Sequence, residues 1–171
     1  MFLETSGIAI TEPMTMATDY VLAMQAWLHG RALRRMVGEH SPEILNKWIR
    51  GFYAAAWGAL AGGTLHGFQL ILSRSALIFL LLATVVAVTA GAFLFLEAGI
   101  ASARQPAATG ALRPTPWVRA MAASALIAGL IAFAGPSLHE HFNQNDLAHI
   151  VLMLGLYCGY RAVSPRGDLN G

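Results

Sequence analysis

The stretch between Arg50 and Glu97 contains a single charged residue, Arg74, and this feature constrains the fold more than any other. Residues 51–73 and 75–96 are therefore two nearly continuous apolar runs. A helix of about 20 mostly apolar residues crosses a hydrocarbon core roughly 30 Å thick, so each run is long enough to span a bilayer. The sequence predicts an integral membrane protein.

The composition favours one membrane domain over a soluble fold. Charged residues make up 12% of the 171-residue chain and hydrophobic residues 56%, whereas globular domains carry roughly 25% charged residues. No shift in composition divides the chain, so we expect a single domain over residues 1–171. The net charge of +2 comes from arginines at the ends of predicted helices, where such residues set topology. We therefore expect no nucleic-acid partner.

Apolar runs bounded by charges and helix breakers predict an all-α, polytopic bundle of five transmembrane helices. The expected spans are 16–36, 49–73, 75–101, 117–138 and 143–163. Lysine and arginine are enriched in cytoplasmic loops, and ten of the eleven such residues fall on one side of this arrangement, with Arg74 on the other. The N-terminus is therefore predicted outside and the C-terminus in the cytoplasm. The abundance of Ala and Gly, with ten Arg to one Lys, is typical of a GC-rich bacterial source and favours the bacterial cytoplasmic membrane.

Four ionisable residues are expected at similar depth in the outer half of the bundle: Asp19, His66, Asp146 and His149. His66 lies seven residues before Ser73, which puts it roughly 10 Å below the outer end of its helix. Only eleven uncharged residues follow Asp19 and fourteen follow Asp146, so both aspartates must enter the membrane if their helices are to cross it. Charged groups at such depth cost roughly 2.5–3.5 kcal/mol and normally face partners inside the bundle.

Asp146 and His149 lie three residues apart on one helix face, a spacing that binds a metal ion or orients the imidazole ring. His66 would supply a third ligand, and Asp19 would accept a proton from the metal-bound water. This interpretation predicts a Zn²⁺ site formed by His66, Asp146 and His149, with Asp19 as the catalytic base.

Other roles compete with metal binding at each of these positions. For either aspartate taken alone, N-capping of a helix is the interpretation we favour. His66 lies among glycines and is as well suited to a hydrogen bond across a close helix contact. Two transmembrane histidines could also ligate a haem, although the neighbouring carboxylates suit a metal hydrate or a proton relay better.

The segments Gly63–His66 and Asp146–His149 resemble the histidine-bearing spans of the membrane hydrolase superfamily of alkaline ceramidases and progestin/adipoQ receptors. That resemblance implies a helical bundle whose histidines hold a zinc ion, which activates water for amide hydrolysis. The chain is also similar to small multi-pass membrane proteins of uncharacterised function, in Thr18–Tyr20, Gly62–Phe68 and Asn145–His149.

The predicted function is zinc-dependent hydrolysis of a lipid amide or ester. The alternative is a non-enzymatic membrane protein, either a small transporter or an assembly subunit, in which the same residues relay protons or fix helix packing. The expected partners are membrane lipids, a lipid substrate and a second copy of the chain. That second copy would pack on a glycine face of the 49–73 span with small-xxx-small spacing, which consists of Gly58, Gly62, Gly63 and Gly67.

Overall fold

The structure is a computed structural model that describes residues 3–5, 8–36, 42–104, 115–135 and 142–164. These residues form five helices and one antiparallel pair of three-residue strands. The elements are β1 (Leu3–Thr5), β2 (Ile8–Ile10), α1 (Pro13–Arg34), α2 (Pro42–Phe68), α3 (Arg74–Arg104), α4 (Thr115–Ala134) and α5 (Gln144–Val163). The all-α prediction is confirmed, apart from the small hairpin, which was not foreseen.

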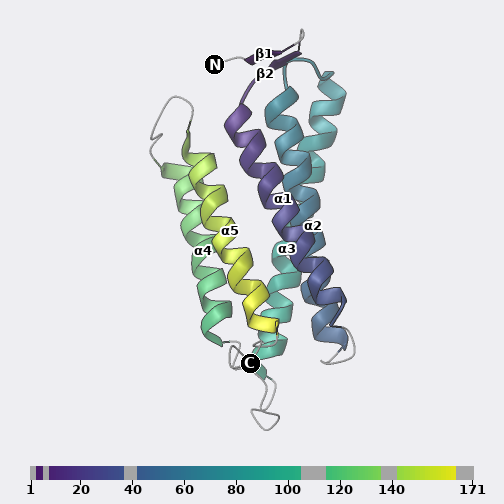
Figure 1. Cartoon of the computed structure of the whole chain (residues 1–171), viewed down its shortest axis with the longest axis vertical. Helices are drawn as coiled ribbons and strands as arrows, with labels where there is room; N and C mark the ends of the chain where they lie inside the picture. Colours follow the sequence, from purple (N-terminus) through teal and green to yellow (C-terminus); the bar gives the residue numbers. More distant parts are fainter. Residues whose placement is uncertain (1–2, 6–7, 37–41, 105–114, 136–141, 165–171) are drawn as a thin grey trace, which may run out of the picture.

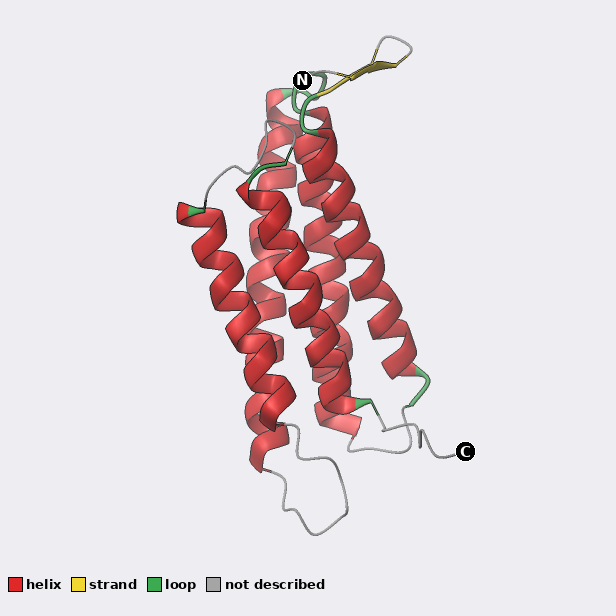
Figure 2. Cartoon of the chain, turned by 60° about the vertical axis from the view of Figure 1, so that its left-hand side comes forward, coloured by secondary structure: helices red, strands yellow, loops and turns green. Residues whose placement is uncertain are grey.

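The helices run alternately up and down along the long axis of the molecule (Figure 1). Chain neighbours pack together in the pairs α1–α2, α2–α3 and α4–α5, and α5 also packs beside α1. We call the end that carries β1, β2 and residues 69–73 the hairpin end, and the opposite end the basic end. Figure 2 shows the two strands, drawn in yellow, at one end of the helical bundle. The first and last helices are thus direct neighbours.

The helix α2 begins at Pro42, seven residues before the predicted start of its span at residue 49. Its first three turns carry Glu43, Lys47 and Arg50, which lie outside the apolar run. Glu43 and Lys47 form an ion pair one turn apart, at 3.4 Å, and such pairs support helix formation. The hydrophobic run therefore predicted the apolar part of α2 but not the charged turns at its start.

The packed core lies mainly toward the basic end, where aromatic rings from α2 and α3 meet. Phe52 and Phe95 lie edge to face with ring centroids 5.1 Å apart, and the centroid of Trp48 lies 5.6 Å from that of Phe95. The Trp48 ring is fully buried, and its Nε1 donates a hydrogen bond to Ser102 Oγ at 3.3 Å. Aromatic pairs of this kind contribute about 0.5–1.5 kcal/mol beyond their buried area. This cluster joins α2 firmly to α3.

Two helices turn their apolar side chains outward. Arg74–Arg104 and Pro116–Ala134 are long and apolar enough to cross a membrane, and few of their residues are buried inside the bundle. Phe133, for example, is 92% exposed and Leu126 is 72% exposed. A helix in the core of a soluble protein buries its apolar stripe, whereas these helices expose theirs. Among the described residues no further helix passes the same test, because polar side chains interrupt α1, α2 and α5.

The glycine face of α2 is covered by α1 and α3 of the same chain. A Cβ added at Gly63 would lie 2.9 Å from Asp19 Cβ, and one added at Gly58 would lie 2.9 Å from Val88 Cγ2. The missing side chains therefore permit close helix contacts. A second copy of the chain would have to displace α1 or α3 to pack on this face.

Candidate functional site

The site lies between α1 and α5 near the hairpin end, and α1 brings Asp19 into it. Asp19 is in the helix interior and is 4% exposed. The capping interpretation of this residue is wrong, since Glu12 occupies the N-cap position and Pro13 begins the helix. Proline suits the first helical turn, because it lacks the N–H group that would be unpaired there. The carboxylate of Asp19 is therefore free of any capping role.

Asp146 takes part in the capping of α5, but as the third residue of its first turn and not as the N-cap residue, which is Asn143. Asn143 Oδ1 accepts hydrogen bonds from the backbone N–H groups of Asn145 and Asp146, at 2.7 and 3.3 Å. In return, Asp146 Oδ2 accepts the backbone N–H of Asn143 at 2.8 Å, which completes a capping box. The side chain of Asp146 is fully buried. One of its oxygens holds the helix start, and the other points to α1.

Thr18 joins the two helices at the centre of the site. Its Oγ1 lies 3.0 Å from Nδ1 of His149, and its single hydrogen can be donated either to Asp146 Oδ1 at 3.4 Å or to the Thr15 carbonyl at 3.1 Å. The other ring nitrogen of His149, Nε2, lies 3.3 Å from Asp19 Oδ1. The structure thus brings together three of the four predicted residues, Asp19, Asp146 and His149.

The second carboxylate oxygen of Asp19, Oδ2, is buried and has no hydrogen-bond partner among the described residues. It faces the bare backbone of α2, because a Cβ built at Gly62 would lie 3.4 Å from it. Leaving a buried polar atom unpaired usually costs about 1–3 kcal/mol, and more when the group is charged. An unpaired buried atom of this kind calls for a specific explanation, and a functional role of the group is one such explanation.

His66 lies in a separate pair nearer the hairpin end. Its Nδ1 lies 3.0 Å from Glu12 Oε2, and the two side chains are 31% and 35% exposed. The two pairs are close enough to influence each other, since His66 interacts electrostatically with His149, and Glu12 with Asp19. His66 therefore belongs to the predicted layer, but its direct partner is Glu12.

The residues do not fit a zinc ion. No group of three or more His, Cys, Asp and Glu side chains in the described parts of the chain is arranged to hold a metal. Both ring nitrogens of His149 already face protein partners, and both oxygens of Asp146 accept hydrogen bonds. The predicted ligand set of His66, Asp146 and His149 thus lacks convergent free lone pairs, and zinc-dependent hydrolysis gains no support from the geometry.

Sequence reasoning missed Thr18 and Glu12 as members of the site. Threonine is common in helices and usually bonds to its own backbone, so nothing in the local sequence marks Thr18 as a bridge between α1 and α5. Glu12 lies just before α1, and its pairing with His66 depends on α1 and α2 being antiparallel neighbours.

Polar contacts continue along the interface of α1 and α5 toward the basic end. Gln25 Nε2 donates to the Met153 carbonyl at 2.9 Å. One turn further along α1, the ring of His29 stacks on Tyr160 with centroids 4.7 Å apart, and its Nδ1 is buried without a hydrogen-bond partner among the described residues. Asp19 Oδ2 and His29 Nδ1 are the two buried side-chain atoms of the described residues left in this condition. Both belong to titratable groups on α1.

The comparisons with known proteins identify a family without identifying an activity. No curated protein and no solved structure matches the chain. A family of unknown function matches over residues 14–126 and 103–168, two overlapping segments that together reach from α1 through α5. The chain belongs to this family, DUF6962, whose function is unknown.

Proposed function

We propose that the protein is a non-enzymatic, multi-pass membrane protein that relays protons across the membrane through Asp19 and His149, in the manner of a small proton transporter. In this proposal all five helices cross a cytoplasmic membrane, with the hairpin end outside. The observation that carries the proposal is the contact between a buried carboxylate and a buried imidazole, with one carboxylate oxygen left without a partner.

The membrane location is supported by the surface of the bundle. Transfer of the outward apolar side chains of α3 and α4 from water into lipid would be favourable by about 25 cal/mol per Å² of exposed apolar area. Lysine and arginine lie at the basic end of every helix: at the ends of α1, α3 and α5 and near the starts of α2 and α4. Among the described residues, Arg74 is the exception at the hairpin end. The positive-inside rule then favours a cytoplasmic basic end.

The hydrogen bonds around His149 favour proton exchange with Asp19. When the Thr18 hydroxyl donates to Asp146 or Thr15, its oxygen accepts from Nδ1, so His149 carries a proton there. The proton between Nε2 and Asp19 Oδ1 then has two positions, one giving an imidazolium facing a carboxylate and the other a carboxylic acid facing a neutral ring. The Asp19–His149 hydrogen bond is kept with the proton in either position, and such a pair suits a proton relay.

Polar side chains lie on both sides of this pair along the bundle. Glu12 and His66 are partly exposed at the hairpin end and interact electrostatically with the buried pair, so protons would enter there. Toward the basic end, Gln25 and His29 continue along α1. The ten residues from Asp19 to His29 correspond to about 15 Å of helix rise, roughly half of a hydrocarbon core.

The test is proton uptake by liposomes that contain the purified full-length protein and a trapped pH-sensitive dye. Under an inward-driving potassium diffusion potential, wild-type liposomes should acidify faster than empty ones, and Asp19→Asn should reduce the rate to that of empty liposomes. Glu97→Gln is the matched control, because this carboxylate is exposed at the basic end and pairs with Lys47. That variant should keep the wild-type rate.

Two outcomes would contradict the proposal. Wild-type liposomes that acidify no faster than empty ones would exclude a relay, as would an Asp19→Asn variant with the wild-type rate. A role in helix packing alone, as in an assembly subunit, predicts instead that Asp19→Asn lowers the unfolding temperature without changing the proton rate of the folded protein.

A further inference from the structure

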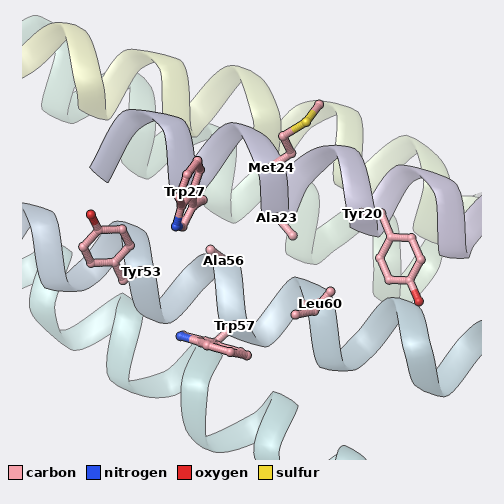
Figure 3. Close-up of a pocket in the computed structure, with 8 residues that line it drawn as sticks. All are labelled: Tyr20, Ala23, Met24, Trp27, Tyr53, Ala56, Trp57 and Leu60. Carbon is pink, nitrogen blue, oxygen red and sulfur yellow. The ribbon is translucent and has the colours of Figure 1, made fainter. Parts of the chain in front are cut away.

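A groove runs between α1 and α2 on the surface of the bundle, outside the proton site. It has a volume of about 430 Å³, within the range of roughly 300–1,000 Å³ of small-molecule sites. Its rim is formed by large side chains and its floor by Ala23 and Ala56 (Figure 3). The rim residues are Tyr20, Met24, Trp27, Tyr53, Trp57 and Leu60. Trp27 and Trp57 are 45% and 68% exposed, so the groove is open to its surroundings.

At the basic end of the groove, each of the two helices carries an arginine next to a rim residue. On α1, Arg31 lies one turn beyond Trp27, and its guanidinium carbon is 5.3 Å from the centroid of that ring. On α2, Arg50 lies three residues before Tyr53, which places it on the same helix face. Both arginines are exposed, and no carboxylate in the described residues pairs with either. The groove is therefore apolar along its length and cationic at one end.

We infer that this groove binds an anionic phospholipid of the cytoplasmic leaflet, with an acyl chain between α1 and α2 and the phosphate at Arg31 and Arg50. The inference rests on the proposed membrane orientation, which puts the arginines at headgroup level, but not on the proton relay. Basic pockets between helices on the cytoplasmic side suit anionic headgroups.

The shape of the groove favours a lipid chain over another helix. Close helix–helix contacts in membranes need small residues at the point of approach, and a helix with its side chains is about 10–12 Å wide. Here the small residues, Ala23 and Ala56, lie at the bottom, and bulky rings stand on either side. A flexible chain can enter such a slot, whereas a helix would meet the rim first.

The test uses quenching of tryptophan fluorescence by phospholipids brominated on their acyl chains. The full-length protein is placed in phosphatidylcholine vesicles in which a fixed fraction of lipid is brominated phosphatidylglycerol or brominated phosphatidylcholine. Trp27 and Trp57 are positioned to report on the groove, whereas Trp48 is buried. The fourth tryptophan, Trp117, is partly exposed on α4, so the measurement is made in a Trp117→Phe background. Phosphatidylglycerol should quench at a severalfold lower fraction than phosphatidylcholine.

Variants test whether the preference for phosphatidylglycerol over phosphatidylcholine arises at the groove. The double variant Arg31→Gln, Arg50→Gln should remove it. The matched control, Arg104→Gln with Arg119→Gln, removes the same charge from exposed positions at the same end of the bundle and should keep it. Ala56→Met, which fills the floor without changing charge, should weaken quenching by both lipids at the groove.

Equal quenching of the wild type by the two lipids would overturn the inference. So would an equal loss of preference in both arginine pairs, since that would indicate general attraction of anionic lipid to the basic end. Absence of quenching by either lipid would mean that the bundle does not insert, which would also remove the membrane location. Asp19→Asn should keep the lipid preference, so a failed proton relay would leave this result unchanged.

Discussion

At the scale of single residues, Thr18 decides how the site is held together. One hydroxyl group contacts His149 and Asp146 on α5 and the Thr15 carbonyl on its own helix. Removing it would leave a ring nitrogen and a carboxylate oxygen without this partner in a place that water reaches poorly. The orientation of the imidazole, and therefore its contact with Asp19, depends on this threonine.

Thr18→Val should accordingly destabilise the protein by about 1–3 kcal/mol, the usual cost of leaving buried polar groups unpaired. Thr84→Val is the matched control, because the Thr84 hydroxyl bonds to the Leu80 carbonyl of its own helix. Its loss should change stability by no more than about 0.5 kcal/mol. Denaturant unfolding of the detergent-solubilised protein measures both, and equal effects of the two substitutions would show that the Thr18 bridge adds nothing.

The sequence foresaw part of this site. The depth of Asp19, Asp146 and His149 follows from counting residues along helices, and the structure brings these three side chains together. Rotation of each helix about its axis does not follow from such a count, because it depends on how neighbouring helices pack. For that reason the pairing of His66 with Glu12, the bridging role of Thr18 and the unsuitability of the group for zinc appeared only in the structure.

At the scale of helices, apolar runs located all five helices, and the errors occurred where charged residues or contacts between distant parts of the chain decided the outcome. The charged first turns of α2 lay outside its apolar run, and the start of α1 depended on Pro13 rather than on Asp19. The glycine spacing predicted that another helix would approach α2 closely. It did not identify α1 as that helix. Glycine spacing tells where a helix can be approached, not by which neighbour.

A pair of glycine substitutions tests this packing. Gly63→Ala should lower stability by about 1–3 kcal/mol, the usual range for overpacking, because the new Cβ would lie 2.9 Å from Asp19 Cβ. Gly129→Ala in α4 should instead raise stability by up to about 1 kcal/mol, since nothing lies within 4 Å of its Cβ position. The two variants, unfolded under the same conditions, should shift in opposite directions. A stabilising Gly63→Ala would mean that α1 and α2 lie further apart than described.

At the scale of the whole molecule, the number of membrane crossings can be tested at α2. This helix crosses the membrane in a five-span topology but not in one where only α3 and α4 cross it. Asn46 lies near the start of α2 and Gln69 directly after its end, and both residues are exposed. They lie on opposite sides of the bilayer only if α2 crosses it.

Single cysteines placed at these two positions in a Cys158→Ser background test that arrangement. In sealed right-side-out vesicles, a membrane-impermeant maleimide should label Gln69→Cys directly and Asn46→Cys only after permeabilisation. Labelling of both cysteines from the same side would exclude a crossing by α2 and would reduce the number of spans. Labelling with the two sides exchanged would retain the crossing and reverse the orientation.

The adjacency of α1 and α5 has a consequence for how the protein is made. Synthesis proceeds from the N-terminus, so in the proposed five-span arrangement Asp19 would reach the bilayer while His149, 130 residues later in the chain, is still untranslated. An unmatched carboxylate there costs roughly 2.5–3.5 kcal/mol, and it is relieved when the final segment arrives. A nascent chain interrupted before that moment would hold its first helix only weakly, which makes the last twenty or so residues of the bundle the checkpoint of biogenesis.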